Sequence, residues 1–453
     1  MDKKVVENKI RRSVKQVHDR NQKRLDKKTT SFISLRIQYN LSIRNQKTNE
    51  EFQISDIEDY MDESPVALIG GPGAGKSTLL LKMAVQLSEK NLDNCAAMIP
   101  IYVQCGLLSS YDRLEDEIHL SGYSEEEKKY LWENGKLCLL FDGINEAVNV
   151  EMGKLLRDVV NLSEEYPECR YVINCRAIEF PIWASSYFEP YSILPVKDEQ
   201  IRTQFCKEFG DVTGEKYYTE LINSSHNYLF ELCKNPLLLS LVIRIISQSM
   251  DSIEEFSFSQ IKGKGDIYRE FCRSLIQHEL KKIKRERESY FEIIRDRLFT
   301  TLAYYMQANN KVYISREEME VVIRNMPYGK GRETDYIKFI SSSSSGEKSL
   351  WYREIAEDVI KSSFFNLHLL ETKESVYISF IHQSFQEFYA GKYMADNNTV
   401  HDKKYVEYLL TMHNRRNWDS IEFSCSLDST NTIIKYVMIY AIINEDTDAL
   451  ILF

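Results

Sequence analysis

The sequence predicts an α/β domain, a parallel sheet with helices on both faces, followed by a largely helical region. Two observations predict this class. Between residues 65 and 196, short apolar segments alternate with helical patterns, as in a parallel sheet whose crossovers are helices. From residue 197 onward, apolar residues recur at three- and four-residue spacing over long stretches, as in helices that pack on one another. The length of 453 residues also exceeds what one core accommodates.

The expected strands of the α/β region are apolar runs bounded by polar residues. They are "PVALIG" (65–70), "AAMIPIYVQC" (96–105), "KLCLLFDG" (136–143) and "CRYVINCR" (169–176). Upstream of them, "FISLRIQYNLSI" (32–43) alternates as strands do, and "RNQKTNEE" (44–51) predicts a hairpin turn. The chain order suggests a sheet with an extra strand between the "PVALIG" strand and the "KLCLLFDG" strand.

The patterning divides the chain into six expected segments. They are a basic helical arm (1–30), a linker with short strands (31–64), the α/β domain (65–196), a helical domain (197–300), a winged-helix domain (301–400) and a short C-terminal helical domain (401–453). The winged-helix expectation rests on two strands around a polar turn, followed by a helix, in "FFNLHLLETKESVYISFIHQSFQEFYAGKYM" (364–394). Ser315, placed before Glu317 and Glu318, predicts a capped helix in the same domain.

Charge is distributed unevenly along the chain. The first 30 residues carry eleven Lys and Arg against four Asp and Glu, a local balance of +7 in a chain of net charge −10. Val6, Ile10, Val14 and Val17 recur at helical spacing within this arm. A basic amphipathic helix binds nucleic acid, anionic lipid or an acidic partner, or leans on the acidic body of its own protein. The last interpretation is favoured.

Cysteine usage and hydropathy indicate a cytoplasmic protein. The nine cysteines are scattered, with no CxxC pair or metal-ligand spacing, which favours free thiols in a reducing compartment. The longest apolar stretch, "NPLLLSLVIRIISQS" (235–249), is interrupted by Arg244 and is too short to span a membrane.

The segment "GGPGAGKST" is a P-loop in the context that the motif requires, directly after a strand and at the start of a helix. Glycines allow consecutive backbone N–H groups to point at phosphate oxygens, and the helix N-terminus adds its positive dipole. Lys76 is expected to reach the β- and γ-phosphates, and the Ser77 hydroxyl to bind Mg²⁺. The expected nucleotide-binding residues are Gly70, Gly71, Pro72, Gly73, Ala74, Gly75, Lys76, Ser77 and Thr78.

A second motif, "LCLLFDGINE" (137–146), supplies carboxylates to the same expected site. Asp142 ends a buried strand, where ligands of parallel sheets collect, and is expected to hold Mg²⁺. Glu146 follows one turn later and is expected to orient or deprotonate the attacking water. Arg176, just beyond the end of another strand, is expected to sense the γ-phosphate.

Five motifs in order resemble those of the NACHT family of STAND NTPases, which includes animal innate-immune receptors and bacterial anti-phage proteins. They are "GGPGAGKST", "LLFDGINE", "INCR", "KNPLLLSL" and "FIHQSFQEFYAGKYMA", and they cover about residues 50–400. The resemblance implies that Pro236 packs on the adenine and that His382 reaches the β-phosphate of bound ADP, which holds the domains closed. Loss of that contact would free the winged helix.

One position departs from the family pattern. Members often carry two acidic residues at the end of the Asp142 motif, whereas here the first is Asn145. The departure predicts slow turnover, which suits a timer or latch.

The motifs together predict a switch that binds ATP, ADP and Mg²⁺, hydrolyses ATP slowly and forms a homo-oligomer when a trigger activates it. Bacterial antiviral defence is the expected setting, with a phage or other pathogen protein as the trigger. One alternative is an AAA-like ATPase acting on nucleic acid through the basic arm and the winged helix. Few basic residues in 375–400, Lys392 being the main one, count against it. The other alternative is a nucleotide-binding scaffold with little turnover, which Asn145 favours.

Overall fold

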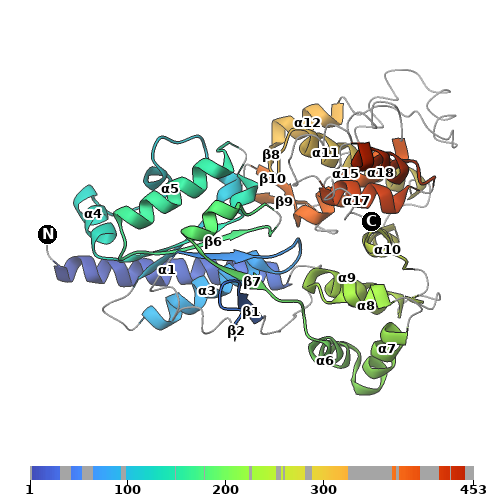
Figure 1. The fold of residues 1–453 in the computed structure, drawn as a ribbon, viewed down its shortest axis with the longest axis horizontal. Helices are drawn as coiled ribbons and strands as arrows, with labels where there is room; N and C mark the ends of the chain where they lie inside the picture. The colour runs from blue at the N-terminus through green and yellow to red at the C-terminus, as the bar shows by residue number, and fades with distance from the viewer. Residues whose placement is uncertain are drawn as a thin grey trace. The chain divides into compact units, whose positions relative to one another are not determined.

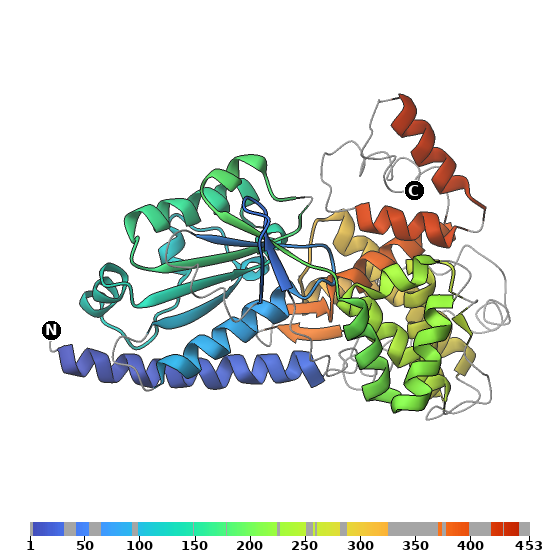
Figure 2. The same cartoon turned by 60° about the horizontal axis from the view of Figure 1, so that its bottom comes forward.

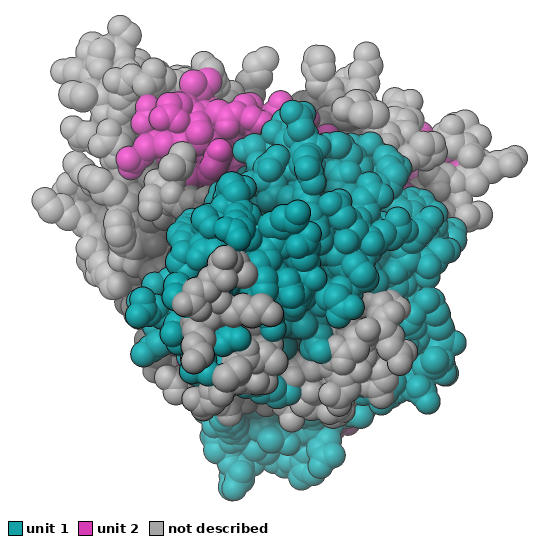
Figure 3. Space-filling view, turned by 90° about the vertical axis from the view of Figure 1, so that its left-hand side faces the viewer, with its two compact units in different colours: residues 1–219, 230–240 teal, residues 220–229, 241–453 magenta. Residues whose placement is uncertain are grey.

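The computed structural model describes most of the chain in two compact units. The described residues are 3–30, 42–53, 65–92, 98–147, 149–177, 179–223, 227–250, 257–258, 261–280, 288–324, 370–373, 377–397, 418–428 and 430–443. The first unit comprises residues 1–219 and 230–240, and the second comprises residues 220–229 and 241–453. Figure 3 shows one face of the first unit in teal. Each unit is described by itself below.

The first unit is built on a seven-stranded sheet with the strand order β2-β1-β7-β3-β6-β5-β4 (Figure 1). Its strands are β1 (Ser42–Asn45), β2 (Glu51–Gln53), β3 (Val66–Ile69), β4 (Ile99–Gln104), β5 (Leu137–Asp142), β6 (Arg170–Cys175) and β7 (Glu189–Ile193). Strands β3 to β7 pair in parallel, as the alternating pattern predicted. Strand β6 lies between β3 and β5, so it is the expected extra strand between the two motif strands.

An antiparallel hairpin extends this parallel sheet at one edge. The predicted turn (44–51) is shorter in the structure, because β1 extends to Asn45 and β2 begins at Glu51, and β1 pairs with β7 through Ile43 and Ile193. The hairpin at 42–53 is therefore a part of the sheet, although the sequence pattern placed it in a linker. Residues 31–41, which were expected to contribute strand structure, lie outside the described residues.

Strand β7 was not predicted from the sequence. It contains Pro190, and proline inside a central strand argues against that assignment because it cannot donate to the ladder. The strand tolerates this residue because the Pro190 carbonyl still accepts a hydrogen bond, from Gln46 N at 2.9 Å. Tertiary pairing on both sides therefore outweighs the local signal.

Helices cover both faces of the sheet. They include α3 (Lys76–Asn91), α4 (Glu125–Glu133) and α5 (Met152–Glu165). Along β5, Leu140 belongs to the core cluster under α3, whereas Leu139 belongs to the cluster that includes Leu155 and Val159 of α5. This alternation is what a strand buried on both faces requires.

The basic N-terminal arm is one long helix, α1 (Lys3–Thr30), that packs against α3 and β4 (Figures 1 and 2). Val6, Ile10 and Val14 are at most 3% exposed and join the core cluster of the sheet. On its polar side Lys9 Nζ donates to Glu127 Oε2 at 2.6 Å. The structure thus agrees with the interpretation that the arm leans on the body of its own protein.

Helices follow the sheet, as the spacing from residue 197 predicted. They are α6 (Asp198–Phe209), α7 (Asp211–Asn223), α8 (Asn227–Cys233) and α9 (Pro236–Ser249).

The second unit combines helices with a small antiparallel sheet. Its elements are α10 (Lys264–Leu280), α11 (Glu288–Ala308), β8 (Ile314–Ser315), α12 (Arg316–Arg324), β9 (Leu370–Lys373), β10 (Tyr377–Phe380), α15 (Gln383–Asn397), α17 (Trp418–Leu427) and α18 (Thr432–Ile443). The sheet order is β8-β10-β9. Phe385, Phe388 and Tyr389 are at most 2% exposed, so they belong to the core of this unit. Ser315 caps α12 by accepting from Glu318 N at 3.1 Å.

None of the helices in the described part of the chain is long and apolar enough to cross a membrane. The eight cysteines that the structure describes are all free thiols.

Candidate nucleotide-binding site

The P-loop connects β3 to α3 in the middle of the sheet. Gly73 and Gly75 have φ values of 74° and 95°, in the left-handed region that side-chain-bearing residues avoid. Gly75 is the N-cap of α3, and no side chain caps that helix end. The first turn of α3, which holds Ser77 and Thr78, is partly exposed. The loop geometry and the uncapped helix N-terminus therefore fit a phosphate group.

Lys76 begins α3 and turns back over the loop. Its Nζ donates to the Gly70 and Gly71 carbonyls at 2.7 and 2.9 Å. Burial among protein atoms and, to a smaller extent, the nearby positive charge of Arg176 together lower the pKa of Lys76 to about 8. Asp142 and Glu146 act on this pKa in the opposite direction. The ammonium is thus held next to carboxylates and one arginine, in a place where an anion would stabilise its charge.

Asp142 ends β5 with both carboxylate oxygens engaged. Asn174, from β6, donates to Oδ1 at 2.6 Å, and its own Oδ1 accepts from Gly143 N at 2.6 Å. The Tyr102 hydroxyl, from β4, donates to Asp142 Oδ2. The neighbouring strands therefore hold the carboxylate in a set orientation at the carboxyl edge of the sheet.

Glu146 and Asn145 lie in the short turn that follows β5. Gly143, at φ 72°, starts a 3₁₀ turn at Ile144–Glu146, and Glu146 N donates to the Gly143 carbonyl at 2.7 Å. Asn145 is 5% exposed, and its amide donates to Glu179 Oε1 at 3.4 Å. The residue that departs from the family pattern thus points to the largely buried carboxylate of Glu179.

Arg176 follows β6 and is 4% exposed. Its Nε lies 3.7 Å from Glu179 Oε1, so this arginine has an acidic neighbour but is not at the surface. Its effect on the pKa of Lys76 places it within electrostatic reach of the P-loop lysine. The structure therefore brings Lys76, Asp142, Glu146 and Arg176 together, and the role of Arg176 as a phosphate sensor stays a prediction.

The "KNPLLL" motif contacts the P-loop through Asn235, which the sequence analysis did not select. Asn235 Nδ2 donates to the Pro72 carbonyl at 2.8 Å, and its Oδ1 caps α9 by accepting from Leu237 N at 3.0 Å. Pro236 occupies the first position of α9, where its fixed φ and missing N–H are tolerated. Contact of Pro236 with adenine stays a prediction.

His382 lies in the second unit, in the turn between β10 and α15. Ser384 N donates to His382 Nδ1 at 3.1 Å, and Tyr268 OH donates to Ser384 Oγ at 2.7 Å. Because Nδ1 accepts the backbone N–H, the neutral ring carries its proton on Nε2, where it acts as a donor. The contact between His382 and ADP stays a prediction.

Replacing Gly73 with alanine is expected to lower the free energy of unfolding by about 1–3 kcal/mol. A Cβ at this position meets Asn235 Oδ1 at 2.7 Å and Leu237 Cβ at 2.9 Å, and its φ of 74° strains any other residue. Urea denaturation in the absence of nucleotide measures the change. Gly71→Ala is the matched control, because a Cβ there meets nothing within 4 Å. Equal loss in both variants would contradict the packing that the structure shows.

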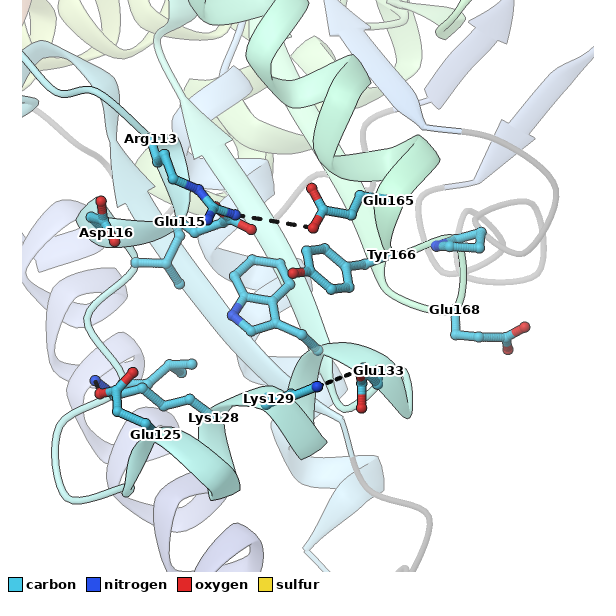
Figure 4. A pocket seen from close by; sticks show the side chains of 14 residues that line it. Arg113, Glu115, Asp116, Glu125, Lys128, Lys129, Glu133, Glu165, Tyr166 and Glu168 are labelled. Carbon is cyan, nitrogen blue, oxygen red and sulfur yellow. Dashed lines mark hydrogen bonds and ion pairs between the residues drawn. The ribbon is translucent and has the colours of Figure 1, made fainter.

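A surface hollow of about 830 Å³ lies away from this site, at the amino ends of β5 and β6 (Figure 4). Trp132 and Tyr166 line it with their rings 4.9 Å apart. The charged side chains that line the hollow are six acidic and three basic ones: Glu115, Asp116, Glu125, Glu133, Glu165, Glu168, Arg113, Lys128 and Lys129. The residues expected to bind phosphate are at the opposite, carboxyl edge of the sheet, so the hollow is separate from the P-loop.

Comparisons with known proteins bear on the first unit. The family model described as "NACHT domain" matches residues 64–211. No curated protein sequence matches the chain.

Two solved structures illustrate how distant the known structural neighbours are. A STAND protein with a tetratricopeptide repeat sensor from Pyrococcus horikoshii has 12% identity and a TM-score of 0.35, covering 85% of this chain and 49% of that one. The chain thus spans about half the length of that protein. Cdc6p from Pyrobaculum aerophilum has 13% identity and a TM-score of 0.33, covering 81% of this chain and 96% of that one. Similarity at this level does not bear on function.

The family match spans β3 with the P-loop, Asp142 with Glu146, and Arg176, all of which the fold brings to one edge of the sheet. Nucleotide binding, typically with Mg²⁺, follows from this family. Residues 64–211 therefore match the NACHT domain, the domain family that the motifs of this segment predicted.

Proposed function

We propose that the chain is a signalling switch controlled by ATP and ADP, which hydrolyses ATP slowly and oligomerises when activated. The observation that carries this proposal is the arrangement of Lys76, Asp142 and Glu146 around one P-loop, with a separate His382 motif in a second compact unit. A ligand shifts a conformational equilibrium only through contacts that differ between the states. A histidine on a separate unit is suited to supply such a contact.

The residues at the carboxyl edge of the sheet fit a nucleotide and Mg²⁺. The P-loop backbone and Lys76 would hold the phosphates, and Ser77 with Asp142 would hold the metal ion. Bound Mg²⁺ would neutralise phosphate charge during cleavage of the terminal phosphoanhydride. Glu146 would orient the attacking water or accept a proton from it. Arg176 would stabilise charge on the terminal phosphate once it exchanges part of its interaction with Glu179.

Asn145 supports slow turnover. Its amide reaches the Glu179 carboxylate and carries no negative charge that would help activate water. Glu146 is then the acidic residue available to this motif for proton transfer. A low rate of hydrolysis suits a switch whose active state must persist.

The second unit supports the assignment of a winged-helix domain. Helix α11 and strand β8 precede α12, and strands β9 and β10 form the hairpin of a sheet ordered β8-β10-β9. His382 lies two residues after the end of β10, and the family resemblance implies contact of this histidine with ADP. Release of that contact would free the winged helix for activation.

Nucleic-acid binding is less favoured than this switch. Lys392, the main basic residue of the hairpin region, donates to Asp296 at 2.8 Å and to Asp396 at 2.7 Å, which offsets its charge. In the basic arm, Lys9 pairs with Glu127. Electrostatic binding to phosphates requires cations that are available to the polymer.

The cellular role belongs to the same proposal. We assign the switch to bacterial antiviral defence in the cytoplasm, with a phage or other pathogen protein as the trigger and further copies of the chain as partners. The family resemblance supports the defence role, and the free thiols of the described residues support a reducing compartment.

The Glu146→Gln variant tests whether hydrolysis is part of the function. We expect wild-type protein to release phosphate slowly but above background, and the variant to do so about 100-fold more slowly, because it lacks a proton acceptor. ADP affinity is expected to stay within about twofold, since Gln keeps the size of the side chain. Glu164→Gln, an exposed position on α5, is the control. Background rates in both wild type and Glu146→Gln would instead support a scaffold without turnover.

A further inference from the structure

The Asp142 carboxylate depends on a residue outside the recognised motifs. Tyr102 lies two residues before the end of β4, and β4 and β5 pair in parallel with Gln104 opposite Asp142. Side chains alternate along a strand, so Tyr102 and Gln104 project from the same face. On that face the Tyr102 hydroxyl donates to Asp142 Oδ2, while Asn174 donates to Oδ1 at 2.6 Å. Two strands therefore position one carboxylate.

Tyr102 is in turn contacted by the N-terminal helix. The Arg24 guanidinium of α1 lies 5.5 Å from the centre of the Tyr102 ring, within the range of a cation–π contact. Helix α1 runs along α3 and β4, so this contact occurs where α1 passes the strand that carries Tyr102.

Helix α1 is anchored upstream of this contact. Ile10 and Val14 are buried in the core of the first unit. Ser13 Oγ and Tyr123 OH are 2.8 Å apart, and His18 Nε2 lies 3.6 Å from Glu89 Oε1. Because these contacts fix the helix at several points, they also fix the backbone that carries Arg24. The position of α1 therefore influences the position of the Tyr102 ring through the Arg24 contact.

We propose that Tyr102 is a positioning residue for the metal-binding carboxylate of Asp142, and that α1 controls that carboxylate through the Arg24–Tyr102 contact. The basic N-terminal helix is then a regulatory element of the nucleotide site. This inference rests on the proposed binding of nucleotide and Mg²⁺ at the P-loop. It adds a control point that lies more than a hundred residues from Asp142 in the sequence.

The physical basis is orientation of the carboxylate. A carboxylate restrained by two donors loses less freedom when it binds a cation than one that rotates. Removal of a hydrogen-bond partner behind a metal ligand typically costs about 10- to 100-fold in metal affinity. A cation–π contact at a partly exposed site contributes less, equivalent to about two- to fivefold.

The test measures metal binding and nucleotide binding separately. Electron paramagnetic resonance of Mn²⁺, added to ADP-loaded protein, gives the metal affinity, and calorimetry with ADP in EDTA gives the nucleotide affinity without metal. Tyr102→Phe is expected to weaken Mn²⁺ binding about 10- to 100-fold. The variant keeps the ring on which Arg24 lies. Because Tyr102 is proposed to act through the metal-binding carboxylate, ADP affinity in EDTA, without metal, is expected to stay within about twofold.

Variants of α1 test the second part of the proposal, that α1 controls the Asp142 carboxylate through the Arg24–Tyr102 contact. Arg24→Ala is expected to weaken Mn²⁺ binding about two- to fivefold, and Arg24→Lys, which keeps the cation, is expected to restore most of it. The matched control is Lys23→Ala, which removes an exposed cation from the neighbouring position of α1 and is expected to change neither affinity.

Three results would overturn the inference. Unchanged Mn²⁺ affinity in Tyr102→Phe removes the positioning role, and an equal loss of ADP affinity in EDTA shows a merely structural role. Equal Mn²⁺ affinity in Arg24→Ala and Lys23→Ala removes the control by α1. Failure of the proposed function is a separate outcome, because wild-type protein would then bind no ADP in either condition.

Discussion

Replacing Lys76 with alanine is expected to weaken ATP and ADP binding by at least about 100-fold, because charge-assisted hydrogen bonds to phosphate contribute about 1.5–3 kcal/mol each. In the structure this ammonium already donates to the carbonyls of Gly70 and Gly71, directly over the loop. Isothermal titration calorimetry with ADP measures the loss. Lys90→Ala, an exposed position in the last turn of the same helix, is the control and is expected to bind as wild type does.

The same lysine predicts how binding depends on pH. Burial and the charge of Arg176 hold the pKa of Lys76 at about 8, well below the ordinary lysine value of 10.5. A bound phosphate stabilises the ammonium and raises this pKa, so binding takes up protons between pH 8 and 10.5, and affinity falls as pH rises through this window. The stability of the protein without nucleotide depends on pH in the opposite direction. The unfolded chain then holds the proton more tightly, so the free energy of unfolding rises over the same window.

Proton uptake is measured by calorimetry at pH 8.5 in two buffers with different ionisation enthalpies. We expect the apparent binding enthalpy to differ between the buffers for wild type. Identical enthalpies in both buffers would show that Lys76 keeps its proton throughout, which contradicts the lowered pKa.

The arrangement of the candidate nucleotide site was largely predictable from the sequence because its main parts are contiguous. The P-loop follows a strand and opens a helix within ten residues, and Asp142 with Glu146 form a short motif after another strand. Local sequence therefore encodes both the residue types and their spacing. Arg176 required one further assumption, that its strand lies between the other two, and the sheet order agrees with it.

The supporting residues depend on pairing between distant segments. Tyr102 and Asn174 reach Asp142 only because β4 and β6 flank β5 in one register, and a tyrosine or asparagine in an apolar strand has no motif of its own. Asn235 reads locally as a helix cap, and its second bond, to Pro72, appears only in the folded chain. Strand β7 was missed because Pro190 obscures it. Sequence patterns do not specify such long-range contacts.

Replacing His382 with alanine is expected to speed ADP release about 10- to 100-fold and to increase the ATP-dependent oligomer, because a hydrogen bond to a charged group contributes about 1.5–3 kcal/mol. The neutral ring donates through Nε2, since Nδ1 accepts from Ser384 N. In the proposed switch, loss of this donor would remove a contact available only in the closed state, so the equilibrium would shift toward the open state. Size-exclusion chromatography with ATP measures the oligomer.

The rate of ADP release tests the switch most directly. Stopped-flow measurement with a fluorescent ADP should compare wild type, His382→Ala, His382→Gln and His119→Ala, the last an exposed histidine of the first unit that serves as the control. The account predicts fast release from His382→Ala, an intermediate rate from His382→Gln, whose amide still donates, and the wild-type rate from His119→Ala. One common rate in all four proteins would contradict a latch formed by His382.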